Sequence, residues 1–443
     1  MHKRRNKVPL LLRRWYASRL AVVAESILIG ILTGFLIVLF RRLLSGGDSL
    51  RQTLYSRLAA LPWQWTLYWC LVLIPAGFFL GLCSLKFPMI RGSGIPQIKG
   101  ALSRLCSFNW LPELPLKFIT GVMGLGLGLS LGREGPSIQM GAYVGKGVLS
   151  IFHRPHRERK VLITAASAAG VAAAFNAPMA GVLFALEELQ AGFSPGIIAC
   201  SMGAAMAADL VAGYFFGLRP IFDFRYISVM PLKSFHWIVL LGVICGLLGD
   251  LFKRSLYFSQ DFYTRLHIPQ LVRPVLPLLV SVFLGFYLFD ITGGGHNLIE
   301  SLSHTERSLE LILLLLAGKI AFTALCYGSG TSGGIFLPLL VCGALAGDGL
   351  GLILNRLGYL TEGQNLNLMI MGMAAFFTGA VGAPVTGIVL ILEMSGNFNH
   401  LSGLVLVCLS AFVTTLIINS RPVYEVLLAR FLKSMRVQKN IAE

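Results

Sequence analysis

One glycine- and proline-rich pattern occurs twice in this chain, once in each half. The sequence G-R-E-G-P at Gly132–Pro136 is matched by G-I-F-L-P at Gly334–Pro338, and later glycines follow at identical spacings. A second set of positions repeats at a constant separation: Ala177, Pro178, Gly181 and Glu187 recur as Ala383, Pro384, Gly387 and Glu393. Two copies of one scaffold are the simplest explanation, so the chain is predicted to fold as two related halves.

The two copies differ at acidic positions. Glu134 in the first copy aligns with Phe336 in the second, and Glu188 aligns with Met394. Acidic side chains within apolar stretches are rare and usually serve a function. Glu134 and Glu188 are therefore the first candidates for functional residues.

The composition indicates an integral membrane protein. Hydrophobic residues make up 55% of the 443 positions, charged residues only 13%, and the mean hydropathy is +0.74, too apolar for a soluble domain. A membrane β-barrel would alternate apolar and polar residues, so we expect an all-α protein. Apolar stretches long enough to cross or nearly cross a bilayer are Ala21–Phe40, Trp65–Cys83, Trp237–Gly249, Val275–Phe289, Leu309–Cys326 and Leu401–Ile418.

The net charge of +17 is placed at the ends of membrane segments rather than in a nucleic-acid-binding patch. Basic residues gather in the N-terminal arm, at 153–160 and near the C-terminus, which is typical of cytoplasmic flanks that also contact anionic membrane lipid. We therefore expect no nucleic-acid partner. The predicted organisation is a basic arm (1–20), a first membrane repeat (21–218), a linker (219–235), a second membrane repeat (236–430) and a basic tail (431–443).

Nothing in the sequence predicts a metal site, a cofactor or catalysis. The 8 cysteines are scattered singly, and the 8 histidines include no H-E-x-x-H motif. The sequence has no G-x-x-x-x-G-K-[ST] loop for ATP and no set of nucleophile and base for an intramembrane hydrolase. We expect a protein that is not an enzyme and needs no cofactor.

Duplication in a membrane protein has a known physical use. If each half crosses the bilayer an odd number of times, the two halves are inverted, and their interrupted helices point at each other near the midplane. The glycine- and proline-rich turns are suited to such interruptions because each proline can begin a helix without losing a hydrogen-bond donor. Several helix starts that converge on one point would bind an anion weakly, without a full countercharge.

Four elements of the sequence closely resemble the signatures of the CLC chloride channels and chloride/proton antiporters: Gly92–Pro96, Gly132–Pro136, Gly334–Pro338 and the late Tyr424. Their order and spacing match over nearly the whole chain. The resemblance implies a prokaryotic-type fold of about 18 tilted, partly interrupted helices in two inverted repeats. It also implies a homodimer with one anion pathway per subunit, in a bacterial inner (plasma) membrane, with both termini cytoplasmic.

The resemblance also assigns roles to residues. Ser93 and Tyr424 would offer hydroxyls to a central anion, and Ile335 and Phe336 would offer backbone N–H groups. Glu134 would be the gating glutamate, whose carboxylate occupies an anion site when ionised and leaves when protonated. The alternative for Glu134 is a simple helix cap.

Glu188 distinguishes an antiporter from a channel. In the family, an acid at the second position of the Glu187-Glu188 pair accompanies proton-coupled members, so exchange of chloride for protons is expected. The alternatives are a passive voltage- or pH-gated chloride channel and, for Glu188 itself, a solvated helix-end acid. Glu187 recurs as Glu393, which favours a structural role for that pair.

The chain departs from many relatives at Gln97 and Lys99, where acids are common. Ser93 does not depart, and because relatives that prefer nitrate or fluoride replace this serine, chloride is the expected ion. Lys117, at the head of an apolar segment, is predicted to be an anchor at the membrane edge.

Overall fold

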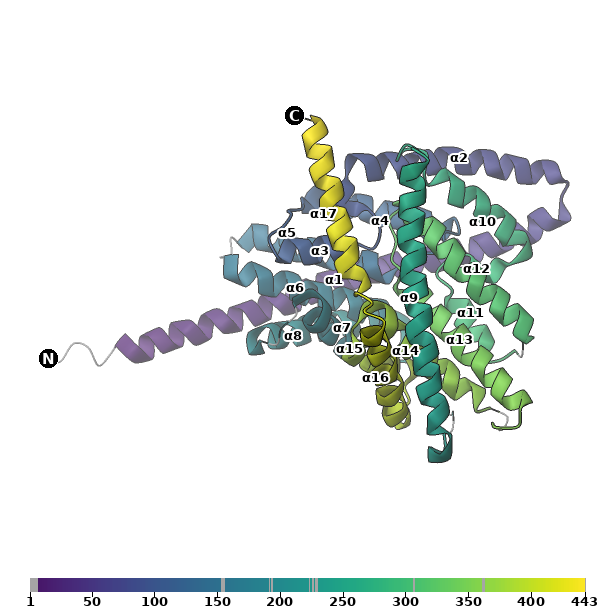
Figure 1. The fold of residues 1–443 in the computed structure, drawn as a ribbon. Helices are drawn as coiled ribbons and strands as arrows, with labels where there is room; N and C mark the ends of the chain where they lie inside the picture. Colours follow the sequence, from purple (N-terminus) through teal and green to yellow (C-terminus); the bar gives the residue numbers. More distant parts are fainter. Residues whose placement is uncertain are drawn as a thin grey trace.

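The computed structural model describes residues 7–152, 156–190, 192, 194–222, 224, 227, 230–305, 307–360 and 363–442. These residues form seventeen α-helices and no β-strand (Figure 1). Among the predicted basic flanks, positions 3–5, part of 153–160 and position 443 lie outside the described residues. The division into membrane repeats stays a prediction.

Eight helices come from the first half of the chain and nine from the second. The first eight are α1 (Lys7–Ala60), α2 (Trp63–Lys86), α3 (Ile95–Leu102), α4 (Trp110–Gly126), α5 (Glu134–Phe152), α6 (His156–Phe175), α7 (Pro178–Phe184) and α8 (Pro195–Phe216). The others are α9 (Phe235–Arg265), α10 (Val275–Tyr287), α11 (His296–Leu302), α12 (Leu309–Gly328), α13 (Phe336–Arg356), α14 (Asn365–Val381), α15 (Pro384–Ser395), α16 (Leu401–Ile417) and α17 (Val423–Ala442). Short turns are η1 (Pro88–Ile90), the π-helical η2 (Ala185–Gln190), η3 (Leu232–Ser234), η4 (Phe289–Ile291) and η5 (Phe398–His400).

Each of the six apolar stretches predicted to cross the membrane lies wholly or mostly in one helix: α1, α2, α9, α10, α12 or α16; Val275–Phe289 runs past the end of α10 into η4. Two of these helices run well past the predicted stretch: α1 continues from Phe40 to Ala60, and α9 continues from Gly249 to Arg265. Within the described residues, seven helices are long and apolar enough to span a bilayer. Two of them, α8 and α13, were not predicted; in α13, glycines interrupt the apolar sequence, and the helix lies almost wholly inside the protein.

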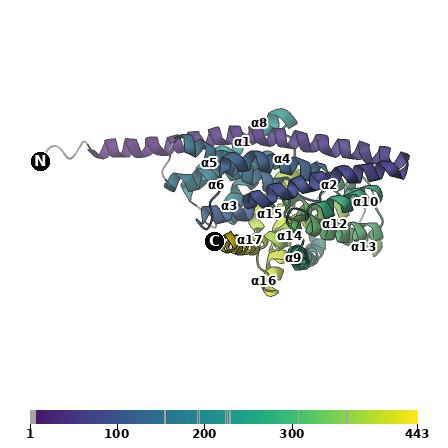
Figure 2. The same ribbon diagram turned by 90° about the horizontal axis from the view of Figure 1, so that it is seen from above.

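Most helices of each half pack together into a cluster, and the two clusters meet at the centre, while α2 lies against α10 and α17 against α3 (Figures 1 and 2). In the first half, α1 packs against α6 and α8, and α5 packs against α6. In the second half, α9 packs against α12, α14 and α16, while α13 packs against α14. The site described below lies where loops from the two clusters touch.

Equivalent glycines of the two halves join these clusters. Gly132 N–H donates to Gly334 O and Gly334 N–H donates to Gly132 O, both at 2.7 Å. Beside them, Gly92 N–H donates to Thr331 O at 3.1 Å, and Gly333 N–H donates to Gly92 O at 3.0 Å. These bonds hold the loops that precede α3, α5 and α13 together.

The structural role predicted for Glu187 and Glu393 is confirmed. Glu187, just beyond α7, accepts hydrogen bonds from the backbone N–H groups of Val385 and Thr386 at the start of α15, the latter at 2.8 Å. Glu393, near the end of α15, accepts from Met179 and Ala180 at the start of α7, at 3.0 and 2.8 Å. Each acid thus caps the other half's helix, which requires α7 and α15 to run antiparallel, as inverted halves should.

We predict that Glu187→Gln and Glu393→Gln each lower the free energy of unfolding by about 1 kcal/mol, because a charged acceptor at a helix start is lost. Thermal unfolding of the detergent-solubilised protein would measure the effect. Glu300→Gln, which alters an exposed acid, is the matched control. An unchanged melting temperature in both variants would contradict the reciprocal capping.

Candidate anion site and proton-accepting glutamates

Three helices begin at the junction between the halves. The first residues of α3, α5 and α13 are Ile95, Glu134 and Phe336, and each follows one of the joined loops. The first N–H groups of a helix have no partner within it and carry partial positive charge. The junction therefore gathers backbone donors suited to a small anion.

At the start of α13, two backbone N–H groups have no backbone partner in the described part of the chain, while the side chains are tightly packed. Among the described residues, neither Ile335 N–H nor Phe336 N–H donates a backbone hydrogen bond. The buried Phe336 ring packs against Phe175, Phe184 and Phe377, with ring centroids 5.0, 5.9 and 4.6 Å away. This aromatic cluster fixes α13, so both N–H groups predicted to bind the anion stay available at a rigid helix start.

Ser93 lies in the loop before α3 and is fully buried. Its hydroxyl accepts a long hydrogen bond of 3.4 Å from Ile95 N–H. The loop lies tightly against the start of α5, since a Cβ on Gly135 would lie 2.7 Å from Ser93 O. The close approach permitted by glycine brings the predicted serine ligand next to the helix that carries Glu134.

Tyr424 is the second residue of α17 and is also fully buried. Its hydroxyl has no hydrogen-bond partner among the described residues, an arrangement that is costly for a buried polar group. Both Glu134 and Glu188 lie within electrostatic range of it. The hydroxyl therefore has an unused donor within electrostatic range of both predicted functional acids.

Glu134 is fully buried at the start of α5, and neither carboxylate oxygen has a hydrogen-bond partner among the described residues. The nearest cation is Arg133, whose Nε lies 3.8 Å from Oε1. A Cβ on Gly132 would clash with Glu134 Oε2 and lie 3.1 Å from Leu337 N, so the carboxylate lies beside the first turn of α13. It is therefore more than a cap of its own helix, because it reaches the start of the opposing one.

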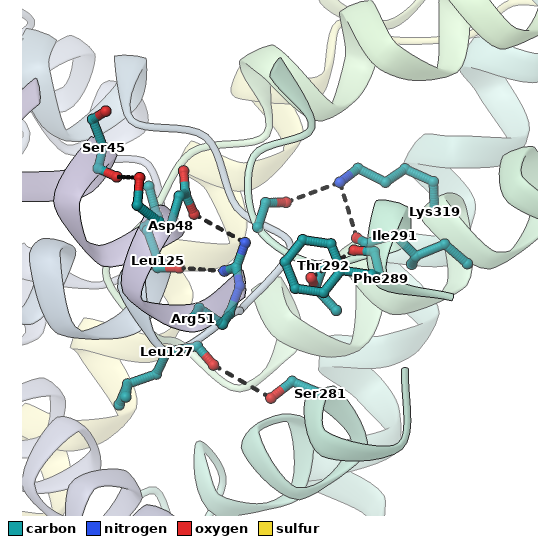
Figure 3. A network of polar contacts seen from close by, with 12 residues as sticks. Ser45, Asp48, Arg51, Leu125, Leu127, Ser281, Phe289, Ile291, Thr292 and Lys319 are labelled. Atoms are coloured by element: carbon teal, nitrogen blue, oxygen red, sulfur yellow. Dashed lines mark hydrogen bonds and ion pairs between the residues drawn. The ribbon is translucent and has the colours of Figure 1, made fainter. Parts of the chain in front are cut away.

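The prediction for Lys117 was wrong. Its side chain is fully buried rather than at a membrane edge, and Nζ donates to Ile90 O at 2.9 Å and Gly92 O at 2.7 Å. Lys319, at the equivalent position of the second half, donates to Ile291 O at 3.0 Å and to Gly293 O at 2.9 Å (Figure 3). A buried cation thus supports one loop in each half, and only the first of these loops leads to Ser93.

Glu188 lies in η2, away from the joined loops. Its side chain is only 6% exposed, so it is not a solvated helix-end acid. Lys99 Nζ, from α3, lies 2.8 Å from Glu188 Oε1 and 4.0 Å from Oε1 of the exposed Glu425. The position where many relatives carry an acid thus holds a cation paired with the predicted proton-accepting residue.

Comparison with known proteins identifies the family. Residues 76–416 match the family model described as voltage gated chloride channel. The chain belongs to the CLC family. The H(+)/Cl(-) exchange transporter ClcA of Cronobacter sakazakii is 34% identical over 435 residues, which cover 95% of this chain and 92% of the relative. ClcA of Salmonella agona is 34% identical over 442 residues, with 97% and 92% covered.

Solved CLC structures confirm the fold. A slow cyanobacterial Cl⁻/H⁺ antiporter superposes with a TM-score of 0.87 at 29% identity, covering 93% of this chain and 98% of that one. A CLC-type fluoride/proton antiporter gives a TM-score of 0.75 at 25% identity, covering 89% and 94%. The predicted resemblance and the all-α CLC fold are therefore both confirmed.

Sequence reasoning missed three charged residues around the site. Lys319 stands at the same separation from Lys117 as Pro338 from Pro136, so the repeat could have revealed it. Lys99 was noticed only as a departure from relatives, and Glu425 was not noticed, although it directly follows the predicted ligand Tyr424. The pairing of Lys99 with Glu188 and Glu425 depends on contacts between α3, η2 and α17 that spacing alone does not predict.

We predict that Lys117→Met weakens chloride binding about tenfold, because the carbonyls of Ile90 and Gly92 lose their donor and the Ser93 loop shifts. Lys319→Met is the matched control, since the same change there disturbs a loop without a predicted ligand. Isothermal titration calorimetry with chloride would measure both. Equal losses of affinity in the two variants would contradict a specific role for Lys117 at the anion site.

Proposed function

We propose that this protein is a secondary active antiporter that moves chloride across the membrane in exchange for protons. One observation carries the proposal: Glu134, a fully buried carboxylate with no hydrogen-bond partner in the described part of the chain, lies where helix starts of both halves converge. A purely structural acid at this place would cost free energy without return. Competition between this acid and an anion for the same donors would explain why the acid is buried here.

The anion would bind beside Glu134 at the centre of the protein. Ser93 and Tyr424 would donate hydroxyl hydrogen bonds, and Ile335 and Phe336 would donate backbone N–H groups. These donors carry partial rather than full charge, so the anion is held weakly enough to leave again. Chloride suits such a site because it needs no directional pairing with a full countercharge.

Glu134 would couple the two substrates. When ionised, its carboxylate repels chloride and competes for the donors at the start of α13. When protonated, it loses that charge and no longer competes, so a proton and an anion favour each other's binding in the same cycle. Arg133, at 3.8 Å, keeps the ionised state accessible within an apolar surround.

Glu188 would deliver protons to Glu134 from the cytoplasmic side. Its aligned residue in the second half, Met394, shows that the scaffold does not need an acid there. Tyr424 lies within electrostatic range of both glutamates, which supports a proton route that passes close to the anion site. Water would carry the proton between the two carboxylates.

A passive channel of the same fold is the alternative. The relatives and the best-superposing neighbour reported above are named as exchangers of protons and chloride, which favours antiport. The presence of an acid at position 188 also favours antiport. A channel gated by voltage or pH would offer no reason for a second buried acid, Glu188, away from the anion site.

The setting follows from the family resemblance. We propose a homodimer with one pathway per subunit, in contact with lipid in a bacterial inner (plasma) membrane. Exposed apolar side chains on α8 and α16, including Met206 and Leu409, are available for a partner subunit or lipid. The predicted basic flanks support a cytoplasmic location for both termini. No cofactor or enzymatic activity is part of the proposal.

We predict that Glu134→Ala and Glu188→Gln each abolish proton transport while chloride still crosses the membrane, because one removes the competing charge and the other the proton donor. Parallel chloride and proton flux assays in liposomes would measure this. Asp261→Asn, which alters a half-exposed acid on α9, is the control and should leave coupling intact. Proton pumping at the parental rate in either glutamate variant would contradict the assigned role.

A further inference from the structure

Glu188 does not act alone at its end of the protein. Its carboxylate and the ammonium of Lys99 form an ion pair of 2.8 Å, with side chains 6% and 17% exposed. A buried charge is stable only when it is paired or neutralised, so Lys99 stabilises the ionised form of Glu188. Proton uptake by Glu188 must therefore work against this cation.

A third charge offers Lys99 another partner. Glu425 Oε1 lies 4.0 Å from Lys99 Nζ, and the Glu425 side chain is 57% exposed to solvent. Lysine has a long, flexible stem, so a small movement exchanges the buried acid for the exposed one. Lys99 thus lies between an acid inside the protein and an acid at its surface.

Within the part of the chain that the structure describes, few other charges face Glu188. The titratable or charged groups around it come from three elements: Lys99 from α3, Tyr424 and Glu425 from α17, and Glu187 from η2 itself. The α6 helix also packs against η2, through Thr164, which carries no charge. Glu187 is already bound to the start of α15. Lys99 is therefore the dominant charge at close range.

We propose that Lys99 and Glu425 form a charge switch that sets when Glu188 takes up a proton, with Lys99 as a positioning residue. While Glu188 is ionised, Lys99 forms an ion pair with it. When a proton arrives, Lys99 turns to Glu425, so the neutral acid does not leave an unpaired cation behind. The switch rests on the proposed function, because it regulates the proton step of the antiport.

The switch predicts opposite effects for its two members. Lys99→Gln removes the charge that opposes protonation, so the midpoint of the pH dependence of proton transport moves up by about 1 pH unit. Glu425→Gln removes the alternative partner, so Lys99 stays on Glu188 and the midpoint moves down. Chloride binding in the absence of a proton gradient should change little in either variant.

The test is chloride-driven proton uptake into liposomes, measured across a pH series for the parent, Lys99→Gln, Glu425→Gln and Lys99→Arg. Lys99→Arg retains the charge and should keep the parental midpoint. Arg104→Gln, which removes an exposed cation from the turn after α3, is the control. Shifts in opposite directions for the two switch residues support the proposal, whereas an unchanged midpoint in Lys99→Gln, or shifts in one direction, overturn it.

Infrared difference spectroscopy separates this inference from the proposed function. The carboxylic-acid band that disappears in Glu188→Gln reports protonation of Glu188 directly, and Lys99→Gln should raise its titration midpoint. If the parent moves no protons at all, the antiport proposal fails, yet this band still tests the ion pair. If the parent pumps protons and the band titrates alike with and without Lys99, only the switch is wrong.

Discussion

The structure depends on a pair of hydrogen bonds between equivalent glycines. Gly132 and Gly334 each donate a backbone N–H to the other's C=O at 2.7 Å, the exchange that two antiparallel segments make. This contact directs the helix starts that follow, at Glu134 and Phe336, toward the same region. The partial charges of helix starts fall off within one turn, so a loss of this contact would disperse the donors of the proposed anion site.

Around this contact, the two halves share their scaffold and differ in their chemistry. Glu187 and Glu393 cap each other's helices, and Lys117 and Lys319 each support a loop with two carbonyl contacts. These pairs maintain the fold, and both copies therefore keep them. The acids to which we assign the proton steps have no counterpart in the other half: Glu134 aligns with a phenylalanine and Glu188 with a methionine.

The sequence predicted the features that depend on composition and repetition. Hydropathy placed six helices, and the repeat identified Glu187 and Glu393 as a structural pair, because scaffold residues recur at fixed separations. Hydropathy did not locate the ends of α1 and α9, since an amphipathic extension lowers the local average without ending the helix. It also misplaced Lys117, because a buried lysine satisfied by backbone carbonyls looks in sequence like one at a membrane edge.

The ion pair between Lys99 and Glu188 lay beyond sequence reasoning for a physical reason. The two residues come from α3 and η2, and their contact depends on how those elements pack. A π-helical turn in η2 changes which side chains face α3, and no spacing rule predicted that turn. The same applies to the Tyr424 hydroxyl, which has no hydrogen-bond partner among the described residues and whose position follows from the docking of α17.

Antiport requires chloride and protons to move in opposite directions through the protein. The most direct measurement uses the purified parent protein in liposomes with an outward chloride gradient and no initial pH gradient. The account predicts that chloride efflux drives protons into the liposomes and acidifies the lumen until a proton uncoupler collapses the gradient. Chloride efflux at a measurable rate without any acidification would contradict it and identify a passive channel.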